Sequence, residues 1–428
     1  MEGLHPKWKG RAAAFLAGQG VTLFGSTLVQ MAIIWFVTLK TSSGAWVTGL
    51  TLCSFLPQMA ISPVSGAWAD RYPRKTLILV ADGVIAVATL ALALLLPVLR
   101  DDAGLLACVL AVSVIRSLGA GVQTPAVNAA IPSLVPGEAL MRYNGVNSAL
   151  QSFVQFAAPA AAGALMATGA LENVLFVDVA TAAVGMGVLA CIALPRAGKA
   201  TEGAPPSLGS DVRMGLRYAF SHKLLKKLLL SYGAFIFLSV PSGFLSALLI
   251  SRTFGERYGY LTIAEMAGFL GMTAGGLLLG AWGGLRNRCK TLVAGLGLYA
   301  AVCAAMGLMR TFAPYAIAMF ALSFAIPVVQ TAVTSLIQEK AAPEMQGRVF
   351  GLLGMCFSGF LPLGMALFGP LADVVSVQTL MLATGALLLL CAAALWADGG
   401  FLRAGLPEEA APQAEPQAMP AAEQKHAP

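Results

Sequence analysis

A basic stretch between two apolar runs reads Gly66-Ala67-Trp68-Ala69-Asp70-Arg71-Tyr72-Pro73-Arg74-Lys75-Thr76-Leu77. Its beginning and its end occur again in the second part of the chain, as Gly280-Ala281-Trp282 and Lys290-Thr291-Leu292, with Arg286 and Arg288 between them. A later pair of matches keeps the same order, Val122-Gln123-Thr124 and then Val329-Gln330-Thr331. Two ordered matches at corresponding places predict a chain built as two related halves.

The composition indicates that most of the surface does not face water. Of 428 residues, 58% are hydrophobic and 11% are charged, whereas a soluble protein carries about 25% charged residues. The net charge of +7 reflects basic residues in short segments between apolar runs, which favours membrane orientation over a nucleic-acid partner. The seven cysteines are scattered and no G-x-x-x-x-G-K-S/T loop occurs. We therefore predict no enzyme, no catalytic residue, no cofactor and no metal site.

Stretches of roughly 20 apolar residues, the length that crosses about 30 Å of hydrocarbon, occur as six, a gap, and six more. They lie at 12–38, 45–68, 76–97, 103–126, 142–167, 170–194, 223–251, 262–284, 289–309, 313–337, 348–372 and 376–398. We predict an all-α integral membrane protein of twelve transmembrane helices. Its parts would be a first half at 1–194, a polar cytoplasmic linker at 195–222, a second half at 223–398, and a disordered cytoplasmic tail at 399–428.

The basic residues also predict the orientation of these helices. With both termini in the cytoplasm, twenty-one Lys and Arg lie on the cytoplasmic side and five on the outer side, while Arg116 is left within a span. The opposite topology would invert the positive-inside rule. We therefore place both termini in the cytoplasm.

The stretch at 66–77 resembles the G-x-x-x-D-R-x-G-R-K/R signature of the major facilitator superfamily, although Pro73 stands where that signature has glycine. The resemblance implies a six-plus-six transporter fold with the substrate site between the halves. It also implies that the loop acts as a conformational latch favouring the outward-facing state. The predicted latch residues are Gly66, Asp70, Arg71, Arg74 and Lys75. The alternative is a basic cluster that only sets orientation.

Four ionisable residues within or near the spans are candidates for proton coupling. Arg116 begins Arg116-Ser117-Leu118-Gly119-Ala120-Gly121, which resembles the superfamily's R-x-x-G-x-G pattern; the alternative is an arginine held by backbone carbonyls. The three histidines lie outside the spans, which leaves carboxylates, and a carboxylate in low dielectric can exchange a proton near neutral pH. We select Asp178, Asp82 and Glu265. Asp82 could instead belong to the basic loop, and Glu265 could be interfacial.

Amide side chains recur on the predicted spans and would line a substrate cavity. The predicted cavity residues are Gln19, Gln30, Gln123, Asn128, Gln151, Gln155 and Gln330. In the fifth span, small residues around Pro159 resemble the G-P-x-x-G-G element of drug–proton antiporters. Small residues permit close helix packing, so Gly145, Pro159 and Gly163 are predicted packing residues.

A narrower resemblance covers residues 7–395. It rests on Gly18-Gln19, Gln30-Met31-Ala32-Ile33-Ile34, Ile115-Arg116-Ser117, Thr124-Pro125-Ala126-Val127-Asn128-Ala129, Gln338-Glu339-Lys340 and Gly347-Arg348-Val349-Phe350. These residues resemble the macrolide-efflux permeases. The resemblance implies a monomeric, proton-driven exporter of hydrophobic or amphipathic small molecules in the bacterial inner membrane. The alternatives are an exporter of an endogenous metabolite such as a siderophore, and a non-transporting membrane scaffold or sensor.

Overall fold

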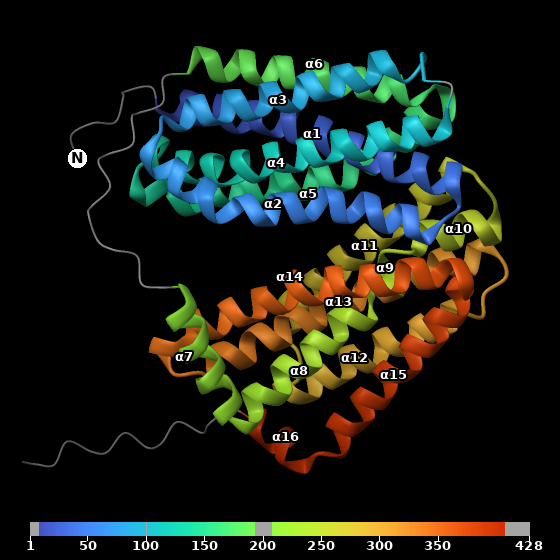
Figure 1. Ribbon diagram of the computed structural model, residues 1–428. Helices are drawn as coiled ribbons and strands as arrows, with labels where there is room; N and C mark the ends of the chain where they lie inside the picture. Colours follow the sequence, from blue (N-terminus) through green and yellow to red (C-terminus); the bar gives the residue numbers. More distant parts are fainter. Residues whose placement is uncertain (1–7, 100, 193–207, 407–428) are drawn as a thin grey trace, which may run out of the picture.

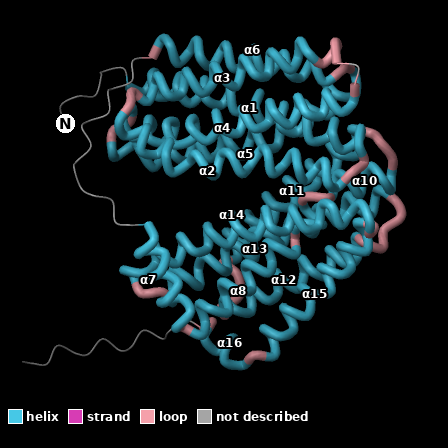
Figure 2. The backbone as a smooth tube through the Cα atoms, viewed as in Figure 1, coloured by secondary structure: helices cyan, strands magenta, loops and turns pink. Residues whose placement is uncertain are grey.

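The computed structural model describes residues 8–99, 101–192 and 208–406. These residues form sixteen helices and no strand (Figures 1 and 2). The first group is α1 (Trp8–Thr41), α2 (Gly44–Arg71), α3 (Arg74–Leu95), α4 (Asp102–Leu134), α5 (Gly137–Thr168) and α6 (Leu171–Cys191). A short α7 (Leu208–Ser221) precedes the second group, which is α8 (Lys223–Leu238), α9 (Val240–Gly243), α10 (Ser246–Phe254), α11 (Tyr258–Trp282), α12 (Arg288–Met306), α13 (Phe312–Lys340), α14 (Pro343–Val374), α15 (Val377–Ala397) and α16 (Gly399–Ala404).

Twelve segments of the described residues are long and apolar enough to cross a membrane. The prediction of an all-α chain with twelve membrane-spanning segments is therefore confirmed. The seventh segment, predicted as one span at 223–251, consists of three successive helices, α8, α9 and α10. The interruption coincides with Pro241 near the start of α9, where a missing N–H prevents a regular helical hydrogen bond.

The predicted tail needs one correction. Its first residues, Gly399–Ala404, form the short helix α16. Asp398 caps this helix by accepting a hydrogen bond from the Phe401 N–H, and the Lys227 ammonium and this cap hold the pKa of Asp398 below its usual range. The alanine- and proline-rich composition that predicted disorder begins only after this helix. Residues 407–428, and 193–207 of the predicted linker, lie outside the described residues.

The two halves have the same helix order in space. In the first half the neighbours run α2–α4–α3–α6–α1–α5, and in the second half α11–α13–α12–α15–α8–α14. When the twelve spans are numbered along the chain, each span of the second half takes the place that the span six numbers earlier has in the first half. The repeat predicted from two short sequence matches is thus a repeat of the whole six-helix packing.

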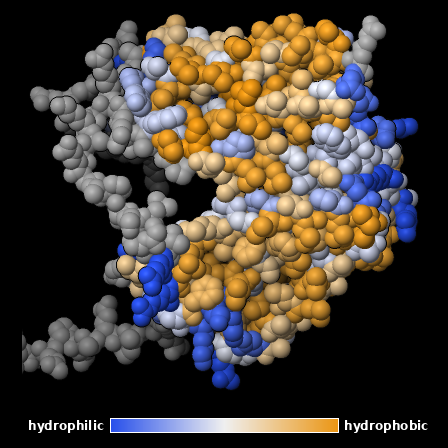
Figure 3. All heavy atoms as spheres, viewed as in Figure 1, coloured by the Kyte–Doolittle hydropathy of each residue, from blue (hydrophilic) through white to orange (hydrophobic). Residues whose placement is uncertain are grey.

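The outer surface suits a lipid environment. In Figure 3 the visible sides of both halves are largely apolar, and the hydrophilic residues gather at the ends. Many large apolar side chains are exposed, among them Val87, Leu277, Ile317 and Leu390. Such a continuous apolar surface would cause a water-soluble protein to aggregate, so it supports the membrane assignment.

The halves touch at one end and separate at the other (Figures 1 and 3). Contacts between them join α2 to α14, α5 to α11 and α1 to α10. We call the end near α10 the closed end and the end near α7 the open end.

A polar cluster holds the closed end together, and we call it the closed-end lock. It consists of residues 42–45 at the start of α2 together with Arg252 and Asp373 of the second half. The Asp373 carboxylate accepts hydrogen bonds from Gly44 N (2.6 Å), Ala45 N (2.9 Å) and the Ser43 hydroxyl (2.8 Å). Arg252 pairs with Asp373 at 2.8 Å and donates to the carbonyls of Ser42 and Ala372. A carboxylate at a helix N-terminus is stabilised by the free N–H groups and the helix dipole.

Close backbone contact beside the lock requires glycine. A Cβ atom on Gly44 would lie 2.1 Å from the carbonyl oxygen of Gly369, and Thr48 donates a hydrogen bond to the Met365 carbonyl one turn further along.

Gly44→Ala is therefore expected to separate the halves at the closed end, because the carbonyl of Gly369 belongs to a helix backbone and cannot move aside cheaply. Spin labels at Ala103→Cys and Glu256→Cys, in a background without native cysteines, would measure this as a longer distance. Gly49→Ala on the same helix is the control, since nothing lies within 4 Å of its added Cβ. Equal distances in the two variants would contradict the expectation.

Candidate functional site

A small polar pocket lies between α1, α4 and α5 of the first half. Its volume is about 160 Å³, and four predicted cavity residues line it, Gln19, Gln123, Asn128 and Gln151, together with Asn147. Every residue that lines this pocket belongs to the first half. All of its polar side chains are amides or hydroxyls, which can bind a neutral polar group by hydrogen bonds.

The other three predicted cavity residues lie elsewhere. Gln30 donates to the Ser54 hydroxyl at 3.1 Å and so joins α1 to α2. Gln155 is exposed on α5, beyond the pocket, and Gln330 is exposed on α13 of the second half. The structure therefore brings together four of the seven residues, and all four belong to the first half.

A second, more apolar pocket of about 450 Å³ lies between the halves, where α2 faces α14. Its walls are Phe55, Gln58 and Met59 from the first half and Phe357, Ser358, Leu361 and Pro362 from the second. None of these residues was predicted from the sequence. Most of them are aromatic or aliphatic, like the residues on the outer apolar surface, so no signal in the sequence separates the two groups.

The predicted coupling residues Arg116 and Asp178 form a buried ion pair. Arg116 of α4 donates to the Asp178 carboxylate of α6 and to the Thr89 hydroxyl of α3. It also approaches the Ser26 carbonyl of α1 at 3.4 Å. The two charged side chains are 7% and 1% exposed. Four helices of the first half therefore meet at this ion pair.

The hydrogen bond from Arg116 to Thr89 is one of two side-chain hydrogen bonds that join α3 to α4 in the described part of the chain. The other joins Gln123, whose amide donates to Asp82 at 2.6 Å. Asp82 and Thr89 are two helical turns apart on α3, as are Gln123 and Arg116 on α4, so antiparallel packing places both contacts in the same seam. Asp82 is 1% exposed, and its second oxygen has no hydrogen-bond partner among the described residues. Gln123 thus contacts a buried carboxylate and also lines the polar pocket.

Glu265 is half-buried on α11 and forms no ion pair within the described part of the chain. It lies one turn from Thr262 on the same helix. Thr262 packs closely against Gly163 of α5, because a Cβ added to that glycine would lie 1.7 Å from the Thr262 hydroxyl oxygen. The predicted packing residue Gly163 therefore acts between the two halves. Pro159 is buried within α5, whereas the structure describes only the backbone of Gly145.

The predicted latch residues lie at the α2–α3 connection. The side chains of Gly66, Asp70 and Arg71 are outside the described residues, while α2 extends to Arg71 and α3 begins at Arg74. Lys75 donates to the carbonyls of Ala190 (2.6 Å) and Ile192 (2.9 Å). A cation at the C-terminus of α6 complements the helix dipole, so Lys75 joins this connection to α6.

Comparison with known proteins agrees with this architecture. The sequence profile of the Major Facilitator Superfamily matches residues 13–360 and 240–423. The chain belongs to the Major Facilitator Superfamily. It is accordingly a multi-pass membrane transporter and not an enzyme.

Among relatives in this superfamily, Macrolide efflux protein A of Streptococcus pyogenes is 30% identical over 387 residues, which cover 90% of this chain and 95% of that protein. Multidrug efflux pump Tap of Mycobacterium tuberculosis is 26% identical over 390 residues, 86% of each chain. A bacterial homologue of the iron transporter ferroportin, solved in an inward-facing state, superimposes with a TM-score of 0.68 at 16% identity and covers 90% of this chain and 98% of its own. The likeness to that structure supports the superfamily fold alone.

Proposed function

We propose that this chain is a secondary active exporter of hydrophobic or amphipathic small molecules, macrolide-like drugs among them. The observation that carries the proposal is the chemistry of two pockets, one within the first half and one between the halves. Amides and a hydroxyl supply the polar groups of the first pocket, aromatic and aliphatic groups form most of the second, and neither contains a charged side chain. A large molecule with a few neutral polar groups fits such walls. The names of the relatives from Streptococcus pyogenes and Mycobacterium tuberculosis support export as the direction.

The proposed mechanism is alternating access. The positive-inside rule assigns the basic open end to the cytoplasm, so the described conformation would admit substrate from inside the cell. Export then requires the closed-end lock to break while the open end closes. A ligand can drive this change only by binding the two conformations with different affinities.

We further propose proton antiport, with Asp82 as the proton-carrying group. Asp82 is buried, one of its oxygens lacks a partner, and Gln123 connects it to the polar pocket. Asp178 is already paired with Arg116, so its contacts fit a structural role.

Drug accumulation in a sensitive host expressing the chain tests the export proposal. Cells should accumulate less of a macrolide or hydrophobic dye, and a protonophore should remove the difference. A panel including siderophores distinguishes the metabolite alternative, for which only the siderophore level would change. Unchanged accumulation of every compound would contradict export.

Asp82→Asn is expected to reduce drug-driven proton movement in proteoliposomes to background while the purified protein still binds drug. Asparagine keeps an oxygen that accepts the Gln123 hydrogen bond, but it cannot carry a proton. Asp101→Asn is the control, because Asp101 only caps α4 through the Gly104 N–H and asparagine caps about as well. Normal proton movement in the Asp82 variant would rule out this residue as the carrier.

A further inference from the structure

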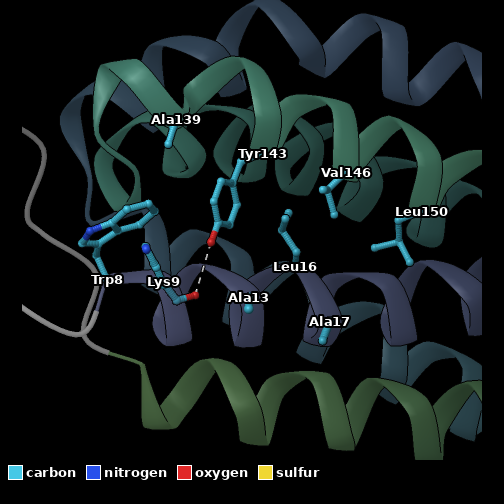
Figure 4. A pocket seen from close by; sticks show the side chains of 9 residues that line it. All are labelled: Trp8, Lys9, Ala13, Leu16, Ala17, Ala139, Tyr143, Val146 and Leu150. Carbon is cyan, nitrogen blue, oxygen red and sulfur yellow. Dashed lines mark hydrogen bonds between the residues drawn. The ribbon is translucent and has the colours of Figure 1, made fainter.

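A groove that the proposed transport cycle does not use lies between α1 and α5 near the open end (Figure 4). Its volume is about 530 Å³. Apolar side chains form most of its walls, and Trp8, Lys9 and Tyr143 stand at its outer end. The complete lining is Trp8, Lys9, Ala13, Leu16 and Ala17 from α1 with Ala139, Tyr143, Val146 and Leu150 from α5.

The groove is separate from the polar pocket of the candidate site. The two share Leu150, which packs so tightly on α1 that a Cβ on Gly20 would lie 2.6 Å from its methyl group. Leu150 therefore closes the inner end of the groove. Figure 4 looks onto the side of the first half where the groove opens between α1 and α5. Val146, which lines the groove on this side, is 50% exposed. In a membrane, that side would contact lipid.

The position of the groove matches the boundary between hydrocarbon and headgroups. Tyr143 lies in the second turn of α5 (Gly137–Thr168), close to the open end, and Leu150 lies two turns further into the helix. Trp8 and Tyr143 pack together with ring centroids 5.7 Å apart, and the Tyr143 hydroxyl approaches the Lys9 carbonyl at 3.5 Å. Tryptophan and tyrosine are enriched at this depth because their rings are amphipathic.

The charged side chain that the structure describes at the outer end of the groove is that of Lys9. The Lys9 ammonium lies 5.8 Å from the centre of the Trp8 ring; it is exposed and has no acidic partner among the described residues. A basic group above an apolar groove complements an amphiphile with an anionic head, since basic pockets between helices on the cytoplasmic side bind acidic lipid headgroups. A cationic drug would be repelled there.

We propose that this groove is a binding site for one anionic phospholipid of the cytoplasmic leaflet. An acyl chain lies between α1 and α5 against Leu16 and Val146, and the headgroup phosphate meets Lys9. The aromatic pair fixes the depth of the glycerol region. The site is independent of whether the chain exports drugs.

Native mass spectrometry of the purified full-length protein tests the site with two lipids of identical acyl chains, phosphatidylglycerol and phosphatidylcholine. The wild-type protein should retain one phosphatidylglycerol in preference to phosphatidylcholine. Lys9→Gln should weaken this retention about fivefold, the effect of removing one basic residue near an anionic lipid. Val146→Trp should remove it by filling the groove.

Lys226→Gln is the matched control. Lys226 is also an exposed lysine near the open end that lies 5.9 Å from an aromatic ring, that of Phe220, but it does not line the groove. Its loss should leave phosphatidylglycerol retention unchanged. Equal retention of both lipids, or equal losses in the two lysine variants, would overturn the proposal. So would a Val146→Trp variant that folds and keeps its lipid but no longer binds a macrolide, because the groove would then be a drug site.

Discussion

Asp178→Asn is expected to lower the free energy of unfolding by about 3–5 kcal/mol, the cost of leaving a buried charge without its partner, and to abolish transport. Arg116 is 7% exposed and an arginine does not deprotonate in proteins, so the neutral amide leaves its positive charge uncompensated between four helices. Arg116→Ala should cost less, because the remaining carboxylate can take up a proton. Thermal unfolding of the purified protein would measure both effects, and an equal or reversed order would contradict this account of the site.

A double variant, Arg116→Gln with Asp178→Asn, separates structure from coupling. It removes both charges, so most of the lost stability should return. If transport returns as well, the ion pair is structural, as its partners Thr89 and Ser26 suggest. If stability returns without transport, the pair takes part in coupling, as the sequence analysis predicted. Lys40→Gln provides the baseline, since the exposed Lys40–Asp102 pair should contribute no more than about 1 kcal/mol.

The fold could be predicted from the sequence because its signals are local. Twelve apolar runs need only length and composition to be recognised, and the repeat needs only two matches in order. The superfamily motif added the connection between α2 and α3. These features depend on neighbouring residues along one segment, which is the information that hydropathy and short motifs contain.

The partners within the site could not be predicted, because they depend on the register between helices. Arg116, Asp82 and Asp178 were all selected from the sequence, but nothing in it indicates which carboxylate faces the arginine. The answer follows from the antiparallel packing of α3 on α4, which places Asp82 opposite Gln123 and Thr89 opposite Arg116.

The closed-end lock was missed for the same reason. Arg252 and Asp373 each follow directly after a predicted span, 223–251 and 348–372, and neither was predicted to have a partner. The Asp373 carboxylate meets Gly44, 329 residues away in the chain. No sequence period connects positions so far apart, and the contact depends on how the two halves sit against each other.

Asp373→Ala is expected to shift the protein away from the conformation closed at the α10 end, by tenfold or more in population. The carboxylate accepts two backbone hydrogen bonds and one hydroxyl hydrogen bond from the first half and pairs with Arg252. Hydrogen bonds to a charged group contribute about 1.5–3 kcal/mol each, and the partial exposure of this pair reduces that contribution. Even one such bond corresponds to about a tenfold change in an equilibrium between two conformations.

Spin labels at Ala103→Cys and Glu256→Cys would measure the shift as a second, longer distance in the variant. Lys40→Gln is the matched control, because its ion pair with Asp102 joins α1 to α4 within one half and should leave the distance distribution unchanged. A variant that opens at the closed end and also loses export would place the lock in the transport cycle, since export requires both conformations to be populated. Wild-type distances in the Asp373 variant would contradict this expectation. They would mean that the α2–α14 and α5–α11 packing holds the halves together without the lock. The transition proposed for export would then have to break apolar contacts instead.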